Sequence, residues 1–217
     1  MDTTEFARRQ MVAQQIRAWE VFDTRTLAVL AEVPRERFVP APFAALAFAE
    51  TQIPLGHDQY MMPPTLEGRL LQSLKLLPIH DVLEIGTGSG FLAACLSRLA
   101  RSVTTIDIFP DLARAAAGKL ADMGYDNVTV KTMDAAQELP EGPFDAIALT
   151  ASLPTFDPRF VAPLKPGGRL FAIVGDPPVM DARLIVRGAD GSLETTSLFE
   201  TNVPPLLNAP APPAFRF

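Results

Sequence analysis

Residues 82–91 read VLEIGTGSGF, an apolar run that leads into a turn of alternating glycines. The apolar residues predict a buried strand, and the pattern from Phe91 onward predicts a helix. Glycines let the backbone turn sharply and let a ligand lie against it, while a helix N-terminus presents free N–H groups to an anion. We therefore expect a ligand-binding turn, rather than a purely structural one, at residues 86–90.

The glycine spacing also favours one class of ligand. It is G-x-G-x-G, and Phe91 stands where a dinucleotide-binding turn has its last glycine. A pyrophosphate site is therefore disfavoured. S-adenosylmethionine fits better, because its only anion is a carboxylate and Ser89 adds a hydroxyl near it. We expect S-adenosylmethionine as the cofactor.

Short apolar runs alternate with helical patterns beyond this turn. Strands are expected at 81–85, 102–106, 127–131, 144–150 and 169–174, and helices at 90–100 and 111–123. This alternation predicts an α/β fold with a doubly wound, mostly parallel sheet covered on both faces. Further on, GADG at 188–191 between 182–187 and 193–199 predicts a C-terminal β-hairpin. The proline-rich tail after Val203 is compatible with docking on the body or with a loose end.

Residues 1–80 differ in character, because helical patterns alternate there with proline-containing loops. The expected helix caps are residues 2–4, Asp23 and Thr65. The side chains expected on the buried helix faces are Val12, Ile16 and Trp19, then Leu27 and Leu30, then Leu70, Leu74 and Leu77. Prolines disfavour continuous helix in the irregular stretch that ends at Pro64. We therefore divide the chain into a helical N-terminal region, 1–80, and a cofactor-binding core with hairpin and tail, 81–217.

Composition excludes several functional classes. The 217 residues are 48% hydrophobic with a net charge of −6, and no basic stretch suits nucleic acid. Cys95 is the single cysteine, so no internal disulfide or cysteine-clustered zinc site is expected, and two histidines without ligand spacing make a metal site unexpected. The polar, acidic N-terminus does not resemble a signal peptide, and no run is long enough to span a membrane. We expect a cytoplasmic protein.

Two acids extend the predicted site. Asp107 ends the second strand, where a carboxylate can accept hydrogen bonds from both ribose hydroxyls. Asp134 follows the third strand and can accept from the adenine amino group. Both fall at the C-terminal ends of consecutive strands, where an open parallel sheet binds ligands. Together with the glycine turn, they favour a functional role over that of solvated loop acids.

Five segments follow one another in an order that resembles class I S-adenosylmethionine-dependent methyltransferases. They are the glycine turn, Asp107, Asp134, PFDAI at 143–147 and LKPGGR at 164–169. More narrowly, the chain resembles protein-L-isoaspartate O-methyltransferases. The segments that carry this resemblance are QQI at 14–16, VPRERFVP at 33–40, IPLG at 53–56, EIGTGSG at 84–90 and TA at 150–151. It covers nearly the whole chain to about Val174, and more loosely to Leu206.

The resemblance implies a Rossmann-like methyltransferase fold and methyl transfer to the side-chain carboxylate of isoaspartate in damaged proteins. It implies that Asp107 binds ribose and that Thr150 lies beside the methionine portion of the cofactor. It also implies that Asp134 and Ala135 border adenine. The remaining residues expected at the cofactor are Glu84, Gly86, Thr87, Gly88, Ser89, Ile108 and Met133.

One segment departs from the family. After the Pro-Leu-Gly segment the family usually reads GQTISQP, with the serine hydroxyl placed at the substrate carboxylate, whereas residues 58–64 here read DQYMMPP. Met62 occupies the serine position, and a thioether cannot donate a hydrogen bond. Pro63 also removes a backbone N–H. Tyr60 and Thr65 carry the nearest hydroxyls, so they are the candidate catalytic residues. Met61 and Met62 are compatible with apolar packing and with an altered substrate pocket.

The sequence is compatible with three functions. The first is methylation of isoaspartyl proteins or peptides. The second is methylation of a different, small-molecule acceptor with the same cofactor, and the third is S-adenosylmethionine binding without catalysis. Intact Gly86, Gly88, Asp107 and Asp134 argue against a decayed cofactor site, while the missing serine separates the first function from the other two.

Overall fold

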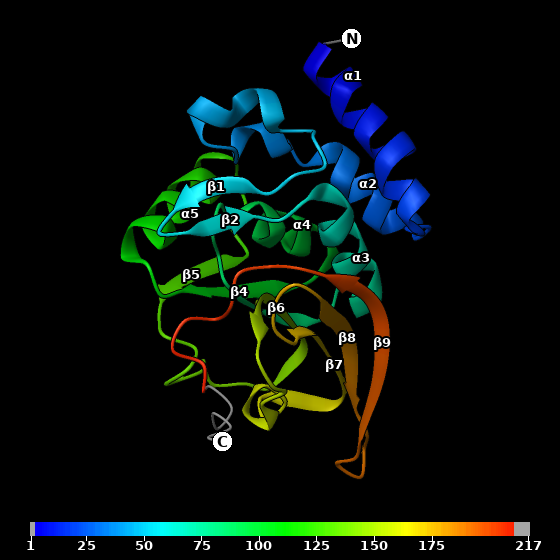
Figure 1. Cartoon of the computed structure of the whole chain (residues 1–217), viewed down its shortest axis with the longest axis vertical. Helices are drawn as coiled ribbons and strands as arrows, with labels where there is room; N and C mark the ends of the chain where they lie inside the picture. The colour runs from blue at the N-terminus through cyan, green and yellow to red at the C-terminus, as the bar shows by residue number, and fades with distance from the viewer. Residues whose placement is uncertain (1–2, 211–217) are drawn as a thin grey trace.

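A computed structural model describes residues 3–210 of the chain. Seven strands form one sheet in the order β5-β4-β3-β6-β7-β8-β9 (Figure 1). The first five strands in this order are parallel, and β8 and β9 add to the edge in antiparallel pairing. Their bounds are β3 Asp81–Ile85, β4 Ser102–Asp107, β5 Val128–Thr132, β6 Phe144–Leu153, β7 Leu164–Val174, β8 Met180–Arg187 and β9 Leu193–Thr201. The predicted α/β fold with a mostly parallel sheet and a C-terminal hairpin is confirmed.

The strand order reverses beside β3. The chain passes from β3 to β4 and β5 on one side, and then returns to place β6 and β7 on the other side. Loops that leave neighbouring strands in opposite directions open a crevice at the carboxyl ends of those strands. The glycine turn follows β3, so the topology places it at this crevice.

The two faces of the sheet are covered differently. The helices α2 Thr24–Glu32, α3 Pro64–Leu74, α4 Phe91–Leu99 and α5 Pro110–Asp122 contribute to a hydrophobic cluster on one face. The other face carries alternate strand residues such as Leu83, Ile147 and Leu170. It is covered by the short 3-10 helix η5, Pro158–Phe160, and by loops (Figure 1). Both faces are therefore buried, as an apolar parallel sheet requires. Among the described residues, α-helices pack on only one of the two faces.

The first two predicted N-terminal helices form, with one correction. Asp23 caps α2 by accepting a hydrogen bond from the Thr26 N–H, and Leu30 is buried. Trp19 is wrong as a core residue, because its side chain is 53% exposed. The helix α1, Thr3–Gln10, continues into a π-helical segment, Met11–Ile16, and a 3-10 turn, Arg17–Trp19. These segments wind differently from an α-helix, so Val12 and Ile16 stay buried while Trp19 turns outward. Asp2, one of the predicted caps, lies outside the described residues.

Helix α3 begins and ends earlier than predicted. Pro63 is its N-cap residue and Pro64 opens it, so Thr65 lies inside the first turn instead of capping the helix. Lys75 adopts a left-handed conformation that ends the helix after Leu74. Leu77 therefore lies beyond the helix and is 47% exposed, whereas Leu70 and Leu74 are buried as predicted.

The stretch before α3, predicted to be irregular, contains a small antiparallel hairpin. Its strands are β1, Ile53–Gly56, and β2, Gln59–Met61, preceded by the 3-10 helices η3, Arg35–Arg37, and η4, Ala41–Leu46. The two turn residues, His57 and Asp58, have φ values of 53° and 55°. Two-residue hairpin turns of this kind are usually Asn-Gly or Asp-Gly, so His-Asp gave no turn signal.

The proline-rich tail docks on the sheet. The Ser152 N–H donates to the Pro204 carbonyl at 3.0 Å, and the Leu206 N–H donates to the Ser152 carbonyl at 2.8 Å. Val203 is buried. The tail therefore lies along the end of β6 at residues 203–206. Of the two alternatives that the sequence left open, this part of the tail is docked and not loose. No helix within residues 3–210 is both long and apolar enough to cross a membrane.

Candidate functional site

The glycine turn is held against strand β6. A Cβ added to Gly86 would lie 2.2 Å from the Thr150 Oγ1, and Gly86 has a φ of +99°. The Thr150 hydroxyl donates to the Ile85 carbonyl at 2.9 Å. Gly90, with a φ of +87°, brings the start of α4 against Ala116 of α5. Both glycines are therefore required by close approach as well as by backbone conformation.

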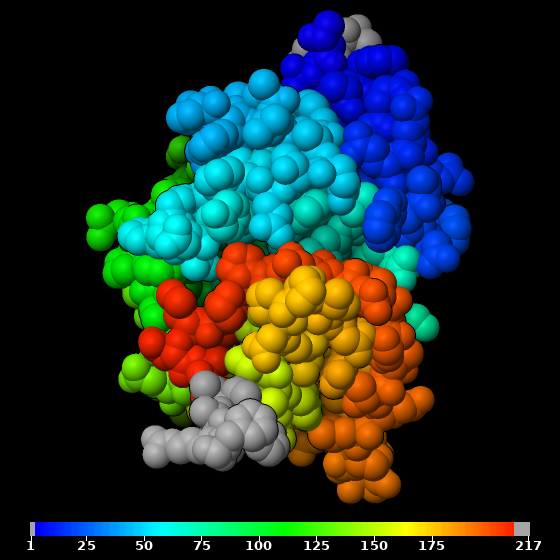
Figure 2. Space-filling view, viewed as in Figure 1, coloured from blue at the N-terminus to red at the C-terminus, as the bar shows by residue number. Residues whose placement is uncertain are grey.

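A cleft of about 700 Å³, open to solvent, lies above the carboxyl ends of β3, β4 and β6. Its walls are the β1–β2 hairpin, the start of α5 and residues Pro204–Leu207 of the tail. In Figure 2 the cyan hairpin, green α5 and red tail border the same part of the surface. The predicted cofactor residues that line the cleft are Gly86, Gly88, Asp107, Ile108, Met133, Asp134, Ala135 and Thr150.

A smaller cavity of about 320 Å³ adjoins the cleft, and the two share Leu55, Tyr60 and the glycine turn. The predicted cofactor residues that line this cavity are Glu84, Gly86, Thr87, Gly88, Ser89 and Thr150. The cavity is also lined by Met62, at the position where the related family carries its serine. The topology therefore brings the predicted cofactor residues and residues 60–62, the predicted acceptor segment, to adjoining spaces.

Asp107 is fixed by the backbone around it. Its Oδ2 accepts from the Gly88 N–H at 2.8 Å and its Oδ1 accepts from the Phe109 N–H at 3.0 Å. Burial raises the pKa of this carboxyl, although both hydrogen bonds act to lower it. A carboxylate has about four lone-pair sites, so two remain for the hydroxyls of a ligand.

Asp134 is held by residues that the sequence did not connect with it. Its Oδ1 accepts from the Ala136 N–H at 2.9 Å, and its Oδ2 accepts from the side-chain amides of Gln137 and Asn208, each at 2.8 Å. Slight burial acts to raise the pKa of Asp134, but the hydrogen bonds outweigh it and the pKa is lowered. Asn208 belongs to the tail, so the tail reaches the adenine end of the predicted site.

Glu84 is buried at the end of β3, and one of its oxygens lacks a partner. Its Oε2 accepts from the Thr105 hydroxyl, while its Oε1 has no hydrogen-bond partner among the described residues. Burial raises the pKa of Glu84 to about 8. An unpartnered buried carboxyl oxygen beside a cavity suits a cationic ligand, and S-adenosylmethionine carries both an ammonium group and a cationic sulfur. The residues present therefore fit the predicted cofactor.

The two candidate catalytic hydroxyls differ in position. Tyr60 lines both the cleft and the smaller cavity and is 41% exposed. Thr65 lines neither space, and its hydroxyl donates to the Glu50 carboxylate. Of the two, only Tyr60 borders these spaces, and Thr65 ties the start of α3 to Glu50.

The hairpin tip is attached to the opposite wall of the cleft. The imidazole of His57 stacks on the Phe109 ring with centroids 4.1 Å apart and planes 9° apart. Its Nε2 lies 2.9 Å from the Asp111 Oδ2, and this contact lowers the pKa of Asp111. The hairpin therefore covers the cleft beside Asp107.

Sequence reasoning missed several lining residues. Leu55, Phe109 and Pro204–Leu207 line the cleft, and Glu67 lines the smaller cavity. Nothing in the local pattern identified the tail. A usable signal existed for Glu67, because it is a charged residue between Leu66 and Leu70 on the apolar face of α3.

Comparison with known proteins gives relatives along nearly the whole chain. The model of the protein-L-isoaspartate(D-aspartate) O-methyltransferase family matches residues 7–209. The protein-L-isoaspartate O-methyltransferase of Koribacter versatilis is 36% identical over 209 residues, covering 95% of this chain and 94% of the relative. The one from Rhodopseudomonas palustris strain ATCC BAA-98 is 38% identical over 201 residues, covering 92% of each.

Two solved structures share the fold. One is a putative protein-L-isoaspartate O-methyltransferase from Plasmodium falciparum in complex with S-adenosyl-L-homocysteine, with a TM-score of 0.81 and 18% identity. It covers 93% of this chain and 98% of its own. The other is described as a protein-L-isoaspartate O-methyltransferase, with a TM-score of 0.77 and 22% identity, covering 91% of this chain and 65% of its own. At these identities the likeness concerns the fold.

Proposed function

Because this chain belongs to the protein-L-isoaspartate(D-aspartate) O-methyltransferase family, we propose that it transfers the methyl group of S-adenosylmethionine to the side-chain carboxylate of isoaspartyl residues in proteins. The observation that carries the proposal is the arrangement of the carboxyl edge of the sheet. There the glycine turn, Asp107 and Asp134 line one cleft, and the acceptor segment 60–62 lines the cavity beside it.

The cofactor residues have distinct roles in this proposal. Asp107, oriented by the Gly88 and Phe109 N–H groups, accepts hydrogen bonds from the ribose hydroxyls. Asp134 borders the adenine, together with Met133 and Ala135. Glu84 offers its unpartnered oxygen to the positive charge of the methionine portion. Gly86, packed against Thr150, lets the backbone of the turn border the cleft where that portion would lie.

The reaction asks little covalent chemistry of the protein. S-adenosylmethionine, when bound, supplies a methyl group on a cationic sulfur, and transfer to a carboxylate oxygen yields a methyl ester and S-adenosylhomocysteine. The acceptor carboxylate is already ionised near neutral pH, so it needs no general base. The contribution of this chain is to orient the acceptor oxygen and to exclude water. Tyr60, Met61 and Met62 line the cavity where this orientation takes place.

The two regions of the chain divide these tasks. Residues 81–217 supply the cofactor groups, and residues 1–80 supply the hairpin, the acceptor segment and Glu67. We propose that this division, with a helical N-terminal region on the acceptor side, describes the organisation of the molecule.

A labelled-methyl assay tests the function. The purified chain is incubated with S-adenosylmethionine labelled in the methyl group and with a peptide that contains isoaspartate. The matched control is the same peptide with normal aspartate. We expect label in the isoaspartyl peptide as a base-labile ester and none above background in the control. Binding of S-adenosylhomocysteine is measured in parallel by calorimetry, which separates loss of the cofactor assignment from loss of the acceptor assignment.

A second acceptor class is favoured by the lining of the smaller cavity. Met62 offers no hydrogen-bond donor there, and the carboxyl groups of Glu67 and Glu84 border the same space. A neutral small-molecule acceptor suits such a cavity better than a carboxylate does, because burying a charged group without a hydrogen-bond donor is costly. If cofactor binds but the isoaspartyl peptide stays unlabelled, transfer to a cell-extract metabolite pool is the result that supports this candidate. A third outcome, binding with no transfer to either, supports a non-catalytic protein.

A further inference from the structure

Arg35 is a fully buried cation that the proposed chemistry does not use. Its guanidinium makes three different contacts: Nε donates to the Ala47 carbonyl at 2.9 Å, Nη2 donates to the Met62 carbonyl at 2.7 Å, and Nη1 pairs with the Glu67 carboxylate. Its side chain has no exposed surface. Each nitrogen of the guanidinium therefore has a partner within the chain.

These partners connect separate parts of the site. Met62 ends the acceptor segment, Glu67 lies on α3, and both line the smaller cavity. The guanidinium carbon also lies 4.7 Å from the centre of the Phe91 ring, and Phe91 opens the helix that follows the glycine turn. The guanidinium of Arg35 thus contacts the acceptor segment, helix α3 and the first residue of α4.

We propose that Arg35 is a positioning residue, which holds the backbone of the acceptor segment 60–62 in register with the cofactor turn. The proposal rests on the proposed function, which places the methyl acceptor in the smaller cavity. Arg35 touches neither acceptor nor cofactor, and it acts through the Met62 carbonyl. It determines where the side chain at position 62 points into the cavity.

The energetics favour a positioning role over simple stability. Burying an ion pair brings little or no net stability relative to apolar residues of similar volume. A planar guanidinium, however, directs its donors in fixed directions, whereas an ammonium is a point charge on a flexible stem. Lysine at position 35 can keep the charge opposite Glu67, but it cannot direct fixed donors at the Ala47 and Met62 carbonyls at the same time. Arg35→Lys therefore separates geometry from charge.

Thiol labelling measures how firmly the segment is held. Cys95 is the chain's single cysteine and is fully buried, with a pKa raised by burial, so a Met62→Cys variant carries one reactive thiol. Labelling rates with a neutral reagent, measured over a pH series to correct for thiolate fraction, report exposure of position 62. We expect Arg35→Lys to speed the labelling of Cys at this position about 10-fold, the scale of one lost hydrogen bond to a charged donor.

The matched control is Arg25→Lys. Arg25 is an exposed residue that likewise donates to two backbone carbonyls, those of Leu76 and Leu99, which lie away from both cavities. In the Met62→Cys background it should leave the labelling rate unchanged. Equal rates in all three proteins would show that Arg35 is only a core residue. If Arg35→Lys fails to fold, Arg35→Gln replaces it, because a glutamine amide keeps a donor but is too short to reach the Ala47 and Met62 carbonyls together, and an unchanged labelling rate in that variant overturns the proposal.

Kinetics give a second readout. Met62→Ser should raise the methylation rate of an isoaspartyl peptide only if the new hydroxyl is held in place. We therefore expect Arg35→Lys to abolish that gain while S-adenosylhomocysteine affinity changes less than twofold. A gain that survives Arg35→Lys contradicts the positioning role. Loss of cofactor binding in the parent chain instead contradicts the proposed function, so the two failures are distinguishable.

Discussion

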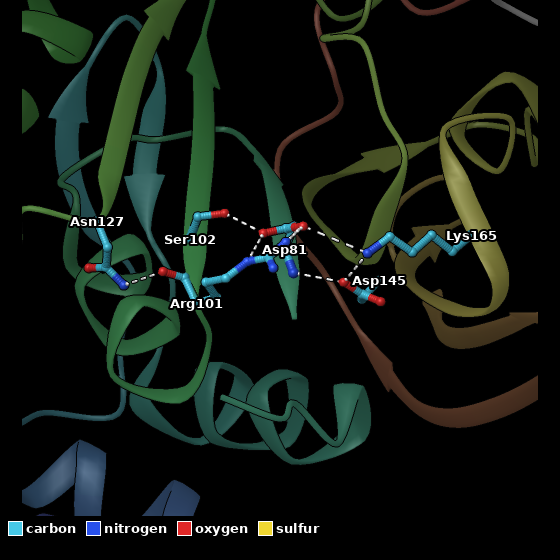
Figure 3. A network of polar contacts seen from close by, with 6 residues as sticks. All are labelled: Asp81, Arg101, Ser102, Asn127, Asp145 and Lys165. Carbon is cyan, nitrogen blue, oxygen red and sulfur yellow. Dashed lines mark hydrogen bonds and ion pairs between the residues drawn. The ribbon is translucent and has the colours of Figure 1, made fainter. Parts of the chain in front are cut away.

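Strand β3 carries one acid near each end, and the two acids meet opposite environments. At its amino end, Asp81 accepts from the Arg101 guanidinium and from the Ser102 hydroxyl at 2.7 Å, and Lys165 lies 3.7 Å away (Figure 3). Its backbone N–H donates to Asp145, which also pairs with Lys165. The hydrogen bond from Arg101 is the largest influence on the pKa of Asp81, which is lowered.

The carboxyl end of β3 lacks such partners. Glu84 is buried with one unpartnered oxygen and a pKa raised to about 8, and the glycine turn follows at once. Two acids only three positions apart are therefore stabilised in opposite charge states by their surroundings. The comparison teaches that the acid at the amino end of β3 is satisfied within the chain, whereas the acid at its carboxyl end keeps one buried oxygen for a ligand to complete.

The largest expected difference between the two ends of β3 lies in how the free energy of unfolding depends on pH. The pKa of Glu84 is raised from 4.5 to about 8, so the folded state binds more protons than the unfolded state between these values. Ionisation of Glu84 therefore lowers the free energy of unfolding as pH rises, by up to about 1.4 kcal/mol per pH unit. Glu84→Gln should remove this decline, so its advantage over the parent should grow from pH 4.5 to pH 8. Glu67 contributes the same trend to both proteins. Urea unfolding at several pH values checks this, and parallel curves would contradict it.

Cofactor affinity should depend on the carboxyl edge alone. Asp107→Ala removes an acceptor of ribose hydrogen bonds, and we expect about 1.5–3 kcal/mol weaker binding of S-adenosylhomocysteine, or about 10- to 150-fold. Asp81→Ala is the matched control at the amino edge, where affinity should not change. Calorimetry on the three proteins is the measurement, and equal affinity in the parent and Asp107→Ala would remove the assignment of Asp107.

The rate of isoaspartyl methylation should rise when one hydroxyl is added to the smaller cavity. Met62→Ser supplies a donor in the smaller cavity, and we expect isoaspartyl methylation to rise about 10-fold, or about 1.4 kcal/mol in the activation free energy. This is the low end of what such a bond contributes, because Pro63 still lacks its N–H. The double change Met62→Ser with Pro63→Gln should do better. Initial rates decide the matter, and a parent rate already at about 1 per second or faster would mean that the missing serine is not limiting.

The smallest effect is expected at the amino edge. The pKa of Asp81 is lowered, so its contribution to stability is present above its unfolded value of about 3.9 and is lost as pH falls through the folded value. Because Asp81 is partly exposed, Asp81→Asn should cost only about 1 kcal/mol at neutral pH, and added salt should reduce the difference. A larger loss that salt does not affect would indicate that the network of Figure 3 contributes through packing.

The parts of the molecule that the sequence could predict are those with a local sequence pattern. The glycine turn, Asp107 and Asp134 were recognisable because each sits at the end of a strand with local periodicity, and parallel strands bring such ends to one edge. The hairpin was not, because its turn is His57-Asp58 and not the Asn-Gly or Asp-Gly pair that marks two-residue hairpin turns. Trp19 was misplaced because a π-helical segment precedes it. The contacts of Arg35 with Glu67 and of Asn208 with Asp134 join residues 32 and 74 positions apart, and no local pattern encodes such pairings.

The docked tail has a consequence for synthesis of the chain on the ribosome. Residues 204–207 wall the cleft and Asn208 donates a hydrogen bond to Asp134, yet these residues are translated long after the glycine turn. The sheet strands β3 to β6 can pair while β8 and β9 are still being made, but the cleft is incomplete until Asn208 has left the exit tunnel. Completion of the cleft therefore follows the pairing of these strands during synthesis.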